Sequence, residues 1–277
     1  MRPKYCYIIC TTPRSGSSLL CDILRATHLA GQPNEYFFHG TYPQFFKQFE
    51  VSTFPDYLQK VLLTTSTPNG VFGAKFMTYY FFDFIERIQR LPAYQTNTHT
   101  TSELLARVFP NLKYIWLTRR DKVRQAVSYA KAIQTDVWHV YGNNPGPAQQ
   151  AIQLREDVVK DLMHGITLQE TAWQEYFSQS NITPLTLVYE DFNQSLEPTA
   201  RLILNYLGVD IPKNWTIEDI KKGTRLANQD SDNFVQSYRE MYKDAWFTWQ
   251  ESSRKTSHRW TVKLKKIRAK ILTALKL

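Results

Sequence analysis

The chain has 277 residues, of which 43% are hydrophobic and 21% charged, and its formal net charge is +9. This length suits one large domain with a sizeable core, and the composition is ordinary for a soluble globular protein. The positive charge is local. Nine of the 34 basic residues follow Glu251, where no acidic residue occurs, and the other 25 balance 25 acidic residues. This distribution argues against a broad nucleic-acid-binding surface.

The three cysteines, Cys6, Cys10 and Cys21, match neither a disulfide framework nor a common zinc pattern. We expect them to be small buried residues in a reducing compartment. No stretch approaches the roughly 20 apolar residues of a membrane span. The apolar run Tyr5–Cys10 is too short for the core of a secretory signal and is more typical of a strand. We therefore predict a cytoplasmic protein.

The N-terminal third begins with a predicted strand over Tyr5–Cys10, followed by a tight loop and a helix. Leucine and isoleucine residues recur at helical spacing after Ser17 and Ser18, either of which is placed to cap that helix. The aromatic- and proline-rich region Tyr36–Asn69 is predicted to be irregular, either an insertion that binds an acceptor or an ordinary surface loop. A second buried strand is expected over Val71–Met77.

In the rest of the chain, predicted strands again alternate with predicted helices. Its expected elements are a strand over Lys113–Thr118, a helix from Asp121, a long helical pattern over Ala148–Ser180 broken or bent near Gly165, a strand over Pro184–Tyr189 and a helix over Glu197–Leu207. Strands alternating with helices predict an α/β fold with a mostly parallel sheet covered on both faces. We expect this domain to occupy residues 1–250 and to be followed by a separate basic tail over residues 251–277.

The loop between the first strand and the first helix has the composition of an anion-binding site. Backbone N–H groups and the positive end of the helix dipole converge there. Gly16 allows close approach, the hydroxyls of Ser15, Ser17 and Ser18 add donors, and Arg14 can bind two oxygens at once. Taken alone, the segment is also compatible with the plain start of a core helix.

A second group of polar residues follows the strand Lys113–Thr118. Arg119 lies at the carboxyl end of this strand, where open parallel sheets bind ligands, and Ser128 follows on the next helix. Together they could bind a second phosphate several ångströms from the first. Arg120 is as compatible with a solvated helix start as with a ligand contact, and Arg124 is expected to be a solvated charge.

The anion loop lacks the first glycine and the lysine of a Walker A motif, G-x-x-x-x-G-K-[ST]. This absence disfavours a P-loop-type kinase that uses ATP, which we keep as an alternative. A second alternative is a non-catalytic, membrane-associated protein that binds a nucleotide or a carbohydrate.

Five segments, in order over roughly residues 5 to 240, match the motifs of one family. They are P-R-S-G-S-S-L-L at Pro13–Leu20, G-Q-P-N-E-Y-F at Gly31–Phe37, G-V-F-G-A-K-F-M at Gly70–Met77, the Arg119–Ser128 element with Gln134–Trp138, and Arg225–Arg239. In these motifs the chain resembles the trehalose 2-sulfotransferase-like bacterial sulfotransferases. The resemblance implies a sulfotransferase α/β fold related to P-loop kinases.

The resemblance also implies a donor, 3′-phosphoadenosine 5′-phosphosulfate (PAPS), and no metal ion. On this basis the segment Arg14–Ser18 holds the 5′-phosphosulfate, Arg119 and Ser128 hold the 3′-phosphate, and a segment beginning at Arg225 closes over the nucleotide. Glu35 matches the catalytic base of the family, and a carboxylate is suited to take the proton of an attacking hydroxyl. Lys75 could pair with Glu35 or bind a phosphate.

The resemblance points to a carbohydrate or glycolipid as the acceptor. Pro13 and Gln32 replace a glutamine and a glutamate of the family pattern, which puts trehalose itself in doubt. In the basic tail, Trp260 and several leucines and isoleucines fall on one helical face. This pattern suits either peripheral contact with an anionic membrane at its inner face, which would favour a glycolipid, or docking on protein. The sequence also allows a homodimer.

Overall fold

The computed structural model describes residues 2–95, 100–138, 152–217 and 229–243. Residues 1–226 form one compact unit. Residues 227–277 form a second unit, whose described part is a helix over residues 229–243. The basic tail over residues 251–277 and Arg225 lie outside the described residues, so the predictions made for them stay predictions.

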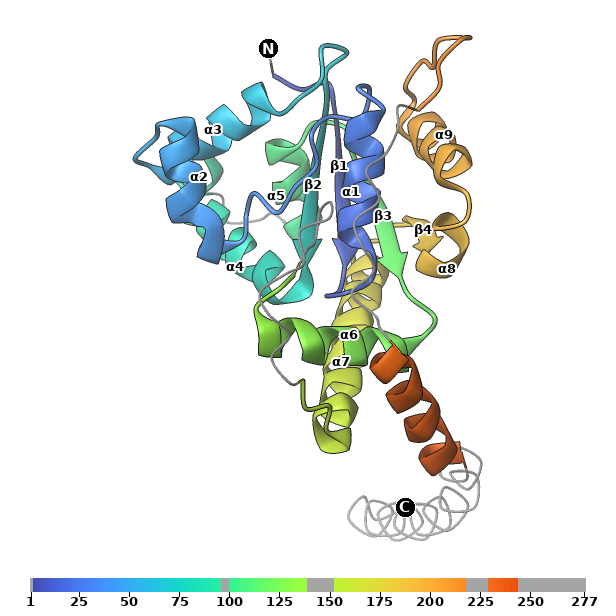
Figure 1. The fold of residues 1–277 in the computed structure, drawn as a ribbon. Helices are drawn as coiled ribbons and strands as arrows, with labels where there is room; N and C mark the ends of the chain where they lie inside the picture. The colour runs from blue at the N-terminus through green and yellow to red at the C-terminus, as the bar shows by residue number, and fades with distance from the viewer. Residues whose placement is uncertain (1, 96–99, 139–151, 218–228, 244–277) are drawn as a thin grey trace, which may run out of the picture. The chain divides into compact units, whose positions relative to one another are not determined.

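In the described part of the chain, four parallel strands form one sheet in the order β2-β1-β3-β4. The strands are β1 (Tyr5–Thr11), β2 (Val71–Met77), β3 (Leu112–Thr118) and β4 (Leu185–Val188). The central strand β1 pairs with β2 along its whole length and with β3 on its other side (Figure 1). The parallel sheet confirms the prediction. Because all strands run the same way, their carboxyl ends lie along one edge of the sheet.

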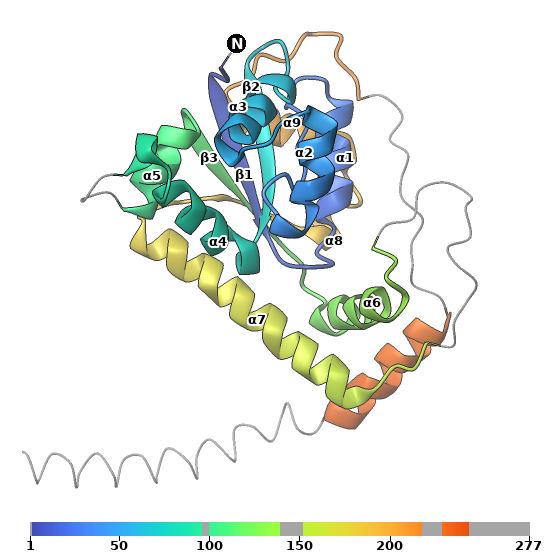
Figure 2. The same ribbon diagram turned by 90° about the vertical axis from the view of Figure 1, so that its left-hand side faces the viewer.

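Both faces of the sheet are covered, as the continuous apolar runs of the strands predict. On one face, Cys6, Ile8 and Cys10 of β1 pack in a core with five helices: α2 (Tyr42–Phe49), α3 (Phe54–Thr64), α4 (Thr78–Gln89), α5 (Thr101–Val108) and α7 (Glu156–Gln179). On the other face, Tyr7 and Ile9 pack with α1 (Ser17–Ala26), α8 (Tyr189–Phe192) and α9 (Leu196–Leu207) (Figure 2). Helix α6 (Lys122–Thr135) follows β3 and packs against α7, and two short 3₁₀ helices span His39–Thr41 and Pro92–Tyr94.

The prediction of an irregular segment over Tyr36–Asn69 is wrong. The segment contains α2 and α3, each with a proline in its first turn, where the missing N–H has no partner to lose. Its aromatic residues, among them the fully buried Tyr57, belong to the main core. The segment therefore supplies packing for the sheet face rather than a separate insertion.

The structure also differs from the prediction in the bounds of one helix and in the N-cap of another. The long helix α7 begins at Glu156 rather than Ala148, and it runs without a break through Gly165. A glycine costs a helix only about 1 kcal/mol and keeps its backbone donor, so the hydrogen-bond ladder continues. The N-cap of α1 is Gly16, not Ser17 or Ser18, and no side-chain hydrogen bond from this residue caps the N-terminus of the helix.

Cys6, Cys10 and Cys21 are buried free thiols, as predicted. Among the described residues, none of the helices combines the length and the apolar character that crossing a bilayer requires.

Candidate active site

The candidate site lies where the carboxyl ends of β1 and β3 meet. Residues 12–16 connect β1 to α1, and residues 119–121 connect β3 to α6. The first connection is tight because Arg14 and Gly16 both adopt the left-handed conformation, with φ of 62° and 89°. Since β1 and β3 are neighbours in the sheet, the two connections lie side by side.

The two predicted anion-binding groups are in direct contact. Arg14 Nε donates a hydrogen bond to Ser128 Oγ at 3.0 Å, which joins the first loop to α6. Arg119 Nη1 donates to the backbone oxygen of Arg14 at 3.2 Å. A further Arg14 nitrogen donates to the carbonyl of Trp138. The residues expected to bind opposite ends of one nucleotide, several ångströms apart, therefore lie in contact with each other.

The site carries an excess of positive charge. Burial lowers the pKa of Arg14, and the charge of Arg119 lowers it further. Burial also lowers the pKa of Arg119, whose cation lies 4.8 Å from the centre of the Tyr189 ring and 3.7 Å from Glu190 Oε1. Arg119 Nε is buried without a hydrogen-bond partner, and no carboxylate of a described residue pairs with Arg14. Two partly buried guanidinium groups on adjoining loops, one of which contacts the backbone of the other, favour an anion nearby.

The loop hydroxyls do not all face this site. Ser15 is fully buried, and its Oγ lies 2.6 Å from Thr11 Oγ1, which in turn donates to the Leu117 carbonyl of β3. The side chain of Ser15 thus ties the loop to the sheet. Ser17 is buried at the first turn of α1, while Ser18 Oγ accepts a hydrogen bond from Lys75 Nζ at 3.5 Å.

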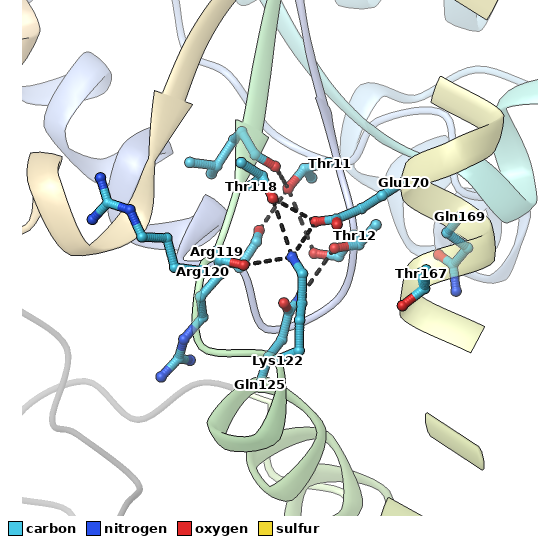
Figure 3. Close-up of polar contacts among 12 residues, drawn as sticks. Thr11, Thr12, Thr118, Arg119, Arg120, Lys122, Gln125, Thr167, Gln169 and Glu170 are labelled. Atoms are coloured by element: carbon cyan, nitrogen blue, oxygen red, sulfur yellow. Dashed lines mark hydrogen bonds and ion pairs between the residues drawn. The ribbon is translucent and has the colours of Figure 1, made fainter. Parts of the chain in front are cut away.

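Gln125 also holds the loop, and the sequence motif gave no sign of this role. This fully buried side chain on α6 donates to Thr12 Oγ1 at 2.9 Å (Figure 3). It also donates to the Pro13 carbonyl at 2.7 Å. The two bonds fix the backbone just before Arg14.

Glu35 is held next to the anion loop by the second strand. Asn34 forms a parallel bridge with Ala74, and the Lys75 N–H donates to the Asn34 carbonyl at 3.0 Å, so the segment lies along the edge of β2. Lys75 Nζ is 3.5 Å from Glu35 Oε1, and Tyr80 OH donates to the same oxygen at 3.3 Å. The Lys75 side chain is only 5% exposed, whereas that of Glu35 is 26% exposed.

Lys75 therefore contacts both Glu35 and Ser18, and the partnership with Glu35 is one of the two roles considered for it. A cavity of about 350 Å³ opens beside this pair. Its lining is mostly polar and comes from α1, from residues 32–36 and from β2: Ser18, Cys21, Arg25, Gln32, Asn34, Glu35, Tyr36 and Lys75. A cavity with this lining can accept a small molecule rich in hydroxyl groups.

Near the site, the carboxylates of Glu190 and Asp191 and the side chain of Arg120 are engaged in hydrogen bonds and ion pairs with other residues of the protein. The two carboxylate oxygens of Asp191 accept from the guanidinium of exposed Arg120, at 2.8 Å and 2.5 Å. The carboxylate of Glu190 accepts from the backbone N–H groups of Arg120 and Asp121, at 2.9 Å and 3.2 Å. Glu190 thus supports the start of α6, and Arg124 pairs with Asp121 at 3.2 Å.

Comparisons with known proteins give a consistent set of relatives. A sequence model of the family described as Stf0 sulphotransferase matches residues 6–241. The trehalose 2-sulfotransferase of Mycobacterium tuberculosis is 29% identical over 259 residues, which cover 84% of this chain and 94% of that protein. That of Mycolicibacterium smegmatis is 29% identical over 263 residues with the same coverage. A solved sulfotransferase from Alicyclobacillus acidocaldarius is 12% identical, covers 86% of this chain and 91% of its own, and has a TM-score of 0.45.

Proposed function

Because this chain belongs to the Stf0 sulphotransferase family and is thus a sulfotransferase, we propose that it transfers a sulfuryl group from PAPS to a carbohydrate hydroxyl. Membership of the family leaves neither the ATP-dependent kinase nor the non-catalytic binder as an alternative. The names of the curated relatives support a sugar as the acceptor. The observation that carries the proposal is the junction of Arg14, Ser128 and Arg119 beside the Glu35–Lys75 pair.

The residues present fit a doubly phosphorylated donor. Arg14 and Arg119 are partly buried cations, Arg119 contacts the backbone carbonyl of Arg14, and Arg119 Nε lacks a hydrogen-bond partner among the described residues. The loop Arg14–Ser18 and the start of α1 would hold the 5′-phosphosulfate through backbone N–H groups. Arg119 and Ser128 would hold the 3′-phosphate. When bound, the donor supplies a sulfuryl group that is activated by its bond to a phosphate.

Glu35 would act as the general base. Its Oε1 is fixed by Lys75 and Tyr80, while no hydrogen bond from a described residue occupies Oε2. Oε2 can therefore accept the proton of an acceptor hydroxyl in the adjoining cavity. The hydroxyl oxygen attacks sulfur as its proton moves to Glu35. The S–O bond to the phosphate breaks, and the electron pair of that bond stays on the leaving phosphate.

Arg14 would stabilise the negative charge that develops in this step, and Lys75 would connect the base to the loop that holds the donor. Arg14 belongs to the loop that would hold the leaving phosphate, so its guanidinium can stabilise the negative charge growing there. Lys75 Nζ lies 3.5 Å from both Glu35 Oε1 and Ser18 Oγ, so its ammonium links the base to the anion loop. Apart from the proton transfer to Glu35, no side chain forms a covalent bond in this step, so positioning and charge stabilisation would dominate catalysis.

The test separates donor binding from chemistry. Calorimetric titration of the full chain should show tighter binding of 3′,5′-diphosphoadenosine (PAP) than of ATP. Incubation of labelled PAPS with extracts of the source cells identifies the acceptor through its labelled product. With that acceptor, Glu35→Gln should lower kcat by about 10²–10⁴-fold while leaving the affinity for PAP within about twofold.

Glu86→Gln on the exposed surface of α4 is the matched control, because among the described residues the Glu86 carboxylate pairs only with Arg90. It should change neither quantity. Unchanged turnover of Glu35→Gln would remove Glu35 from the mechanism. Tighter binding of ATP than of PAP would refute the proposed donor.

A further inference from the structure

Helix α7 contacts the ends of both strands that carry the anion-binding loops. Trp173 Nε1 donates to the carbonyl of Thr11, the last residue of β1, at 2.9 Å. Glu170 lies three residues earlier and thus on the same side of the helix. Its Oε1 accepts a hydrogen bond of 2.5 Å from Thr118 Oγ1, at the end of β3. One face of α7 therefore holds the starting points of both loops.

The contact at β3 is built around a shielded ion pair. Lys122 Nζ lies 2.6 Å from Glu170 Oε1, and the two side chains are 25% and 12% exposed. The same ammonium donates to Thr118 Oγ1 at 3.2 Å and to the backbone carbonyl of Arg119. Figure 3 shows Lys122 between these three partners. A lysine ammonium has three donors, so each one has an acceptor and the side chain is fixed.

This arrangement locks the peptide bond between Arg119 and Arg120. Its carbonyl oxygen accepts from Lys122, and its N–H donates to Glu190 Oε2 at 2.9 Å. The orientation of this peptide sets the direction in which the Arg119 side chain leaves the backbone. That side chain passes the ring of Tyr189 and reaches the Arg14 carbonyl. Arg119 is thus held in one position before any ligand arrives.

The cluster is not explained by stability alone. Partly buried ion pairs often contribute little to folding, because the loss of hydration offsets their attraction. What this pair does provide is a defined geometry at the residue that the donor needs. We propose that Lys122 and Glu170 are positioning residues that fix Arg119 for recognition of the 3′-phosphate. The inference rests on the proposed function.

The experiment compares two nucleotides that differ only in the 3′-phosphate. Calorimetry on the full chain gives the dissociation constants of PAP and of adenosine 5′-monophosphate, and their ratio measures recognition of that phosphate. Charge-assisted hydrogen bonds make us expect a ratio of about 10–100 in the unsubstituted protein. Glu170→Gln keeps the shape of the side chain but removes its charge. It should lower the ratio about tenfold and leave the affinity for adenosine 5′-monophosphate within about twofold.

Two further variants exclude a merely structural effect. In an Arg119→Ala background, Glu170→Gln should change the ratio by less than about twofold, because the residue it positions is gone. Trp173→Phe is the matched control on the same helix. It removes the bond to Thr11 and should lower the melting temperature, while the ratio stays unchanged. Lys122→Met replaces Glu170→Gln if the latter does not fold.

The outcomes separate this inference from the function on which it rests. If the unsubstituted chain binds both nucleotides equally, the proposed donor is wrong, and this inference falls with it. If the unsubstituted chain prefers PAP and Glu170→Gln keeps the full preference, the positioning role alone is refuted. An equal loss of affinity for both nucleotides, or an undiminished effect in the Arg119→Ala background, also refutes it.

Discussion

Substitution of Gly16 by alanine tests how tightly the anion loop is packed. Gly16 has φ of 89°, and a Cβ there would lie 2.2 Å from Tyr189 Cδ2. The left-handed backbone costs an alanine about 1–2 kcal/mol. Forcing the Tyr189 ring aside adds about 1–3 kcal/mol, as in other overpacked sites. We therefore expect Gly16→Ala to lower the free energy of unfolding by about 2–5 kcal/mol, as measured by urea denaturation.

Gly208 provides the control for the backbone term. It has φ of 77° at the end of α9, and apart from its own chain neighbours no described residue has an atom within 4 Å of the Cβ that an alanine would add. Gly208→Ala should thus lose only the cost of the backbone conformation, about 1–2 kcal/mol. The difference between the two variants measures the contact with Tyr189.

Two results would refute this reasoning. One is an equal loss of unfolding free energy in Gly16→Ala and Gly208→Ala. The other is an undiminished excess when Gly16→Ala is made in a Tyr189→Ala background, where the clash is absent. Because the ring of Tyr189 lies 4.8 Å from the cation of Arg119, Gly16→Ala should also weaken PAP binding. Gly208→Ala should not.

Burial raises the pKa of Cys6 from its ordinary 9.0 to about 12 and that of Cys21 to about 11. The stability linked to these protonated thiols is fully present below pH 9.0 and is lost as the pH rises toward those values, so urea denaturation should show falling stability across that range. Iodoacetamide at about pH 8 should label them only after unfolding; rapid labelling of the native chain would contradict their burial. Arg120→Ala should leave PAP affinity within about twofold in calorimetry, because its exposed pair with Asp191 contributes little. Gln125→Leu should lower the free energy of unfolding by about 1–3 kcal/mol, because the Pro13 carbonyl loses its buried donor; a stability equal to that of the unsubstituted chain would show that water replaces the bond.

Local sequence patterns were sufficient to predict the strands and the anion loop. The apolar runs of β1, β2 and β3 can be buried only in a parallel sheet covered on both faces, and their ends differ from the predicted ones by at most one residue. The tight loop after β1 could be predicted because serine, glycine and arginine cluster at one strand–helix junction, and its role in anion binding stays a prediction. The helices within Tyr36–Asn69 were missed, because their aromatic residues become helical through packing on the sheet rather than through intrinsic preference.

The site itself depends on contacts between residues far apart in the sequence. The motifs place Arg14 and Arg119 at two strand ends, but only the strand order brings those ends together and lets Arg14 reach Ser128. The same holds for the hydrogen bond from Tyr80 to Glu35, which needs α4 to pack beside β2.

The amino-acid sequence by itself determined the fold class, through the alternation of strands and helices, and the composition of the loop after β1, through a short run of neighbouring residues. Glu35 was chosen as the candidate base because its motif resembles that of a known family. The tertiary structure alone decided that Lys75 links Glu35 to the anion loop and that Lys122 and Glu170 hold the peptide after Arg119. These contacts join elements whose distance in space is set by strand order and helix packing. No local pattern of residues encodes that distance.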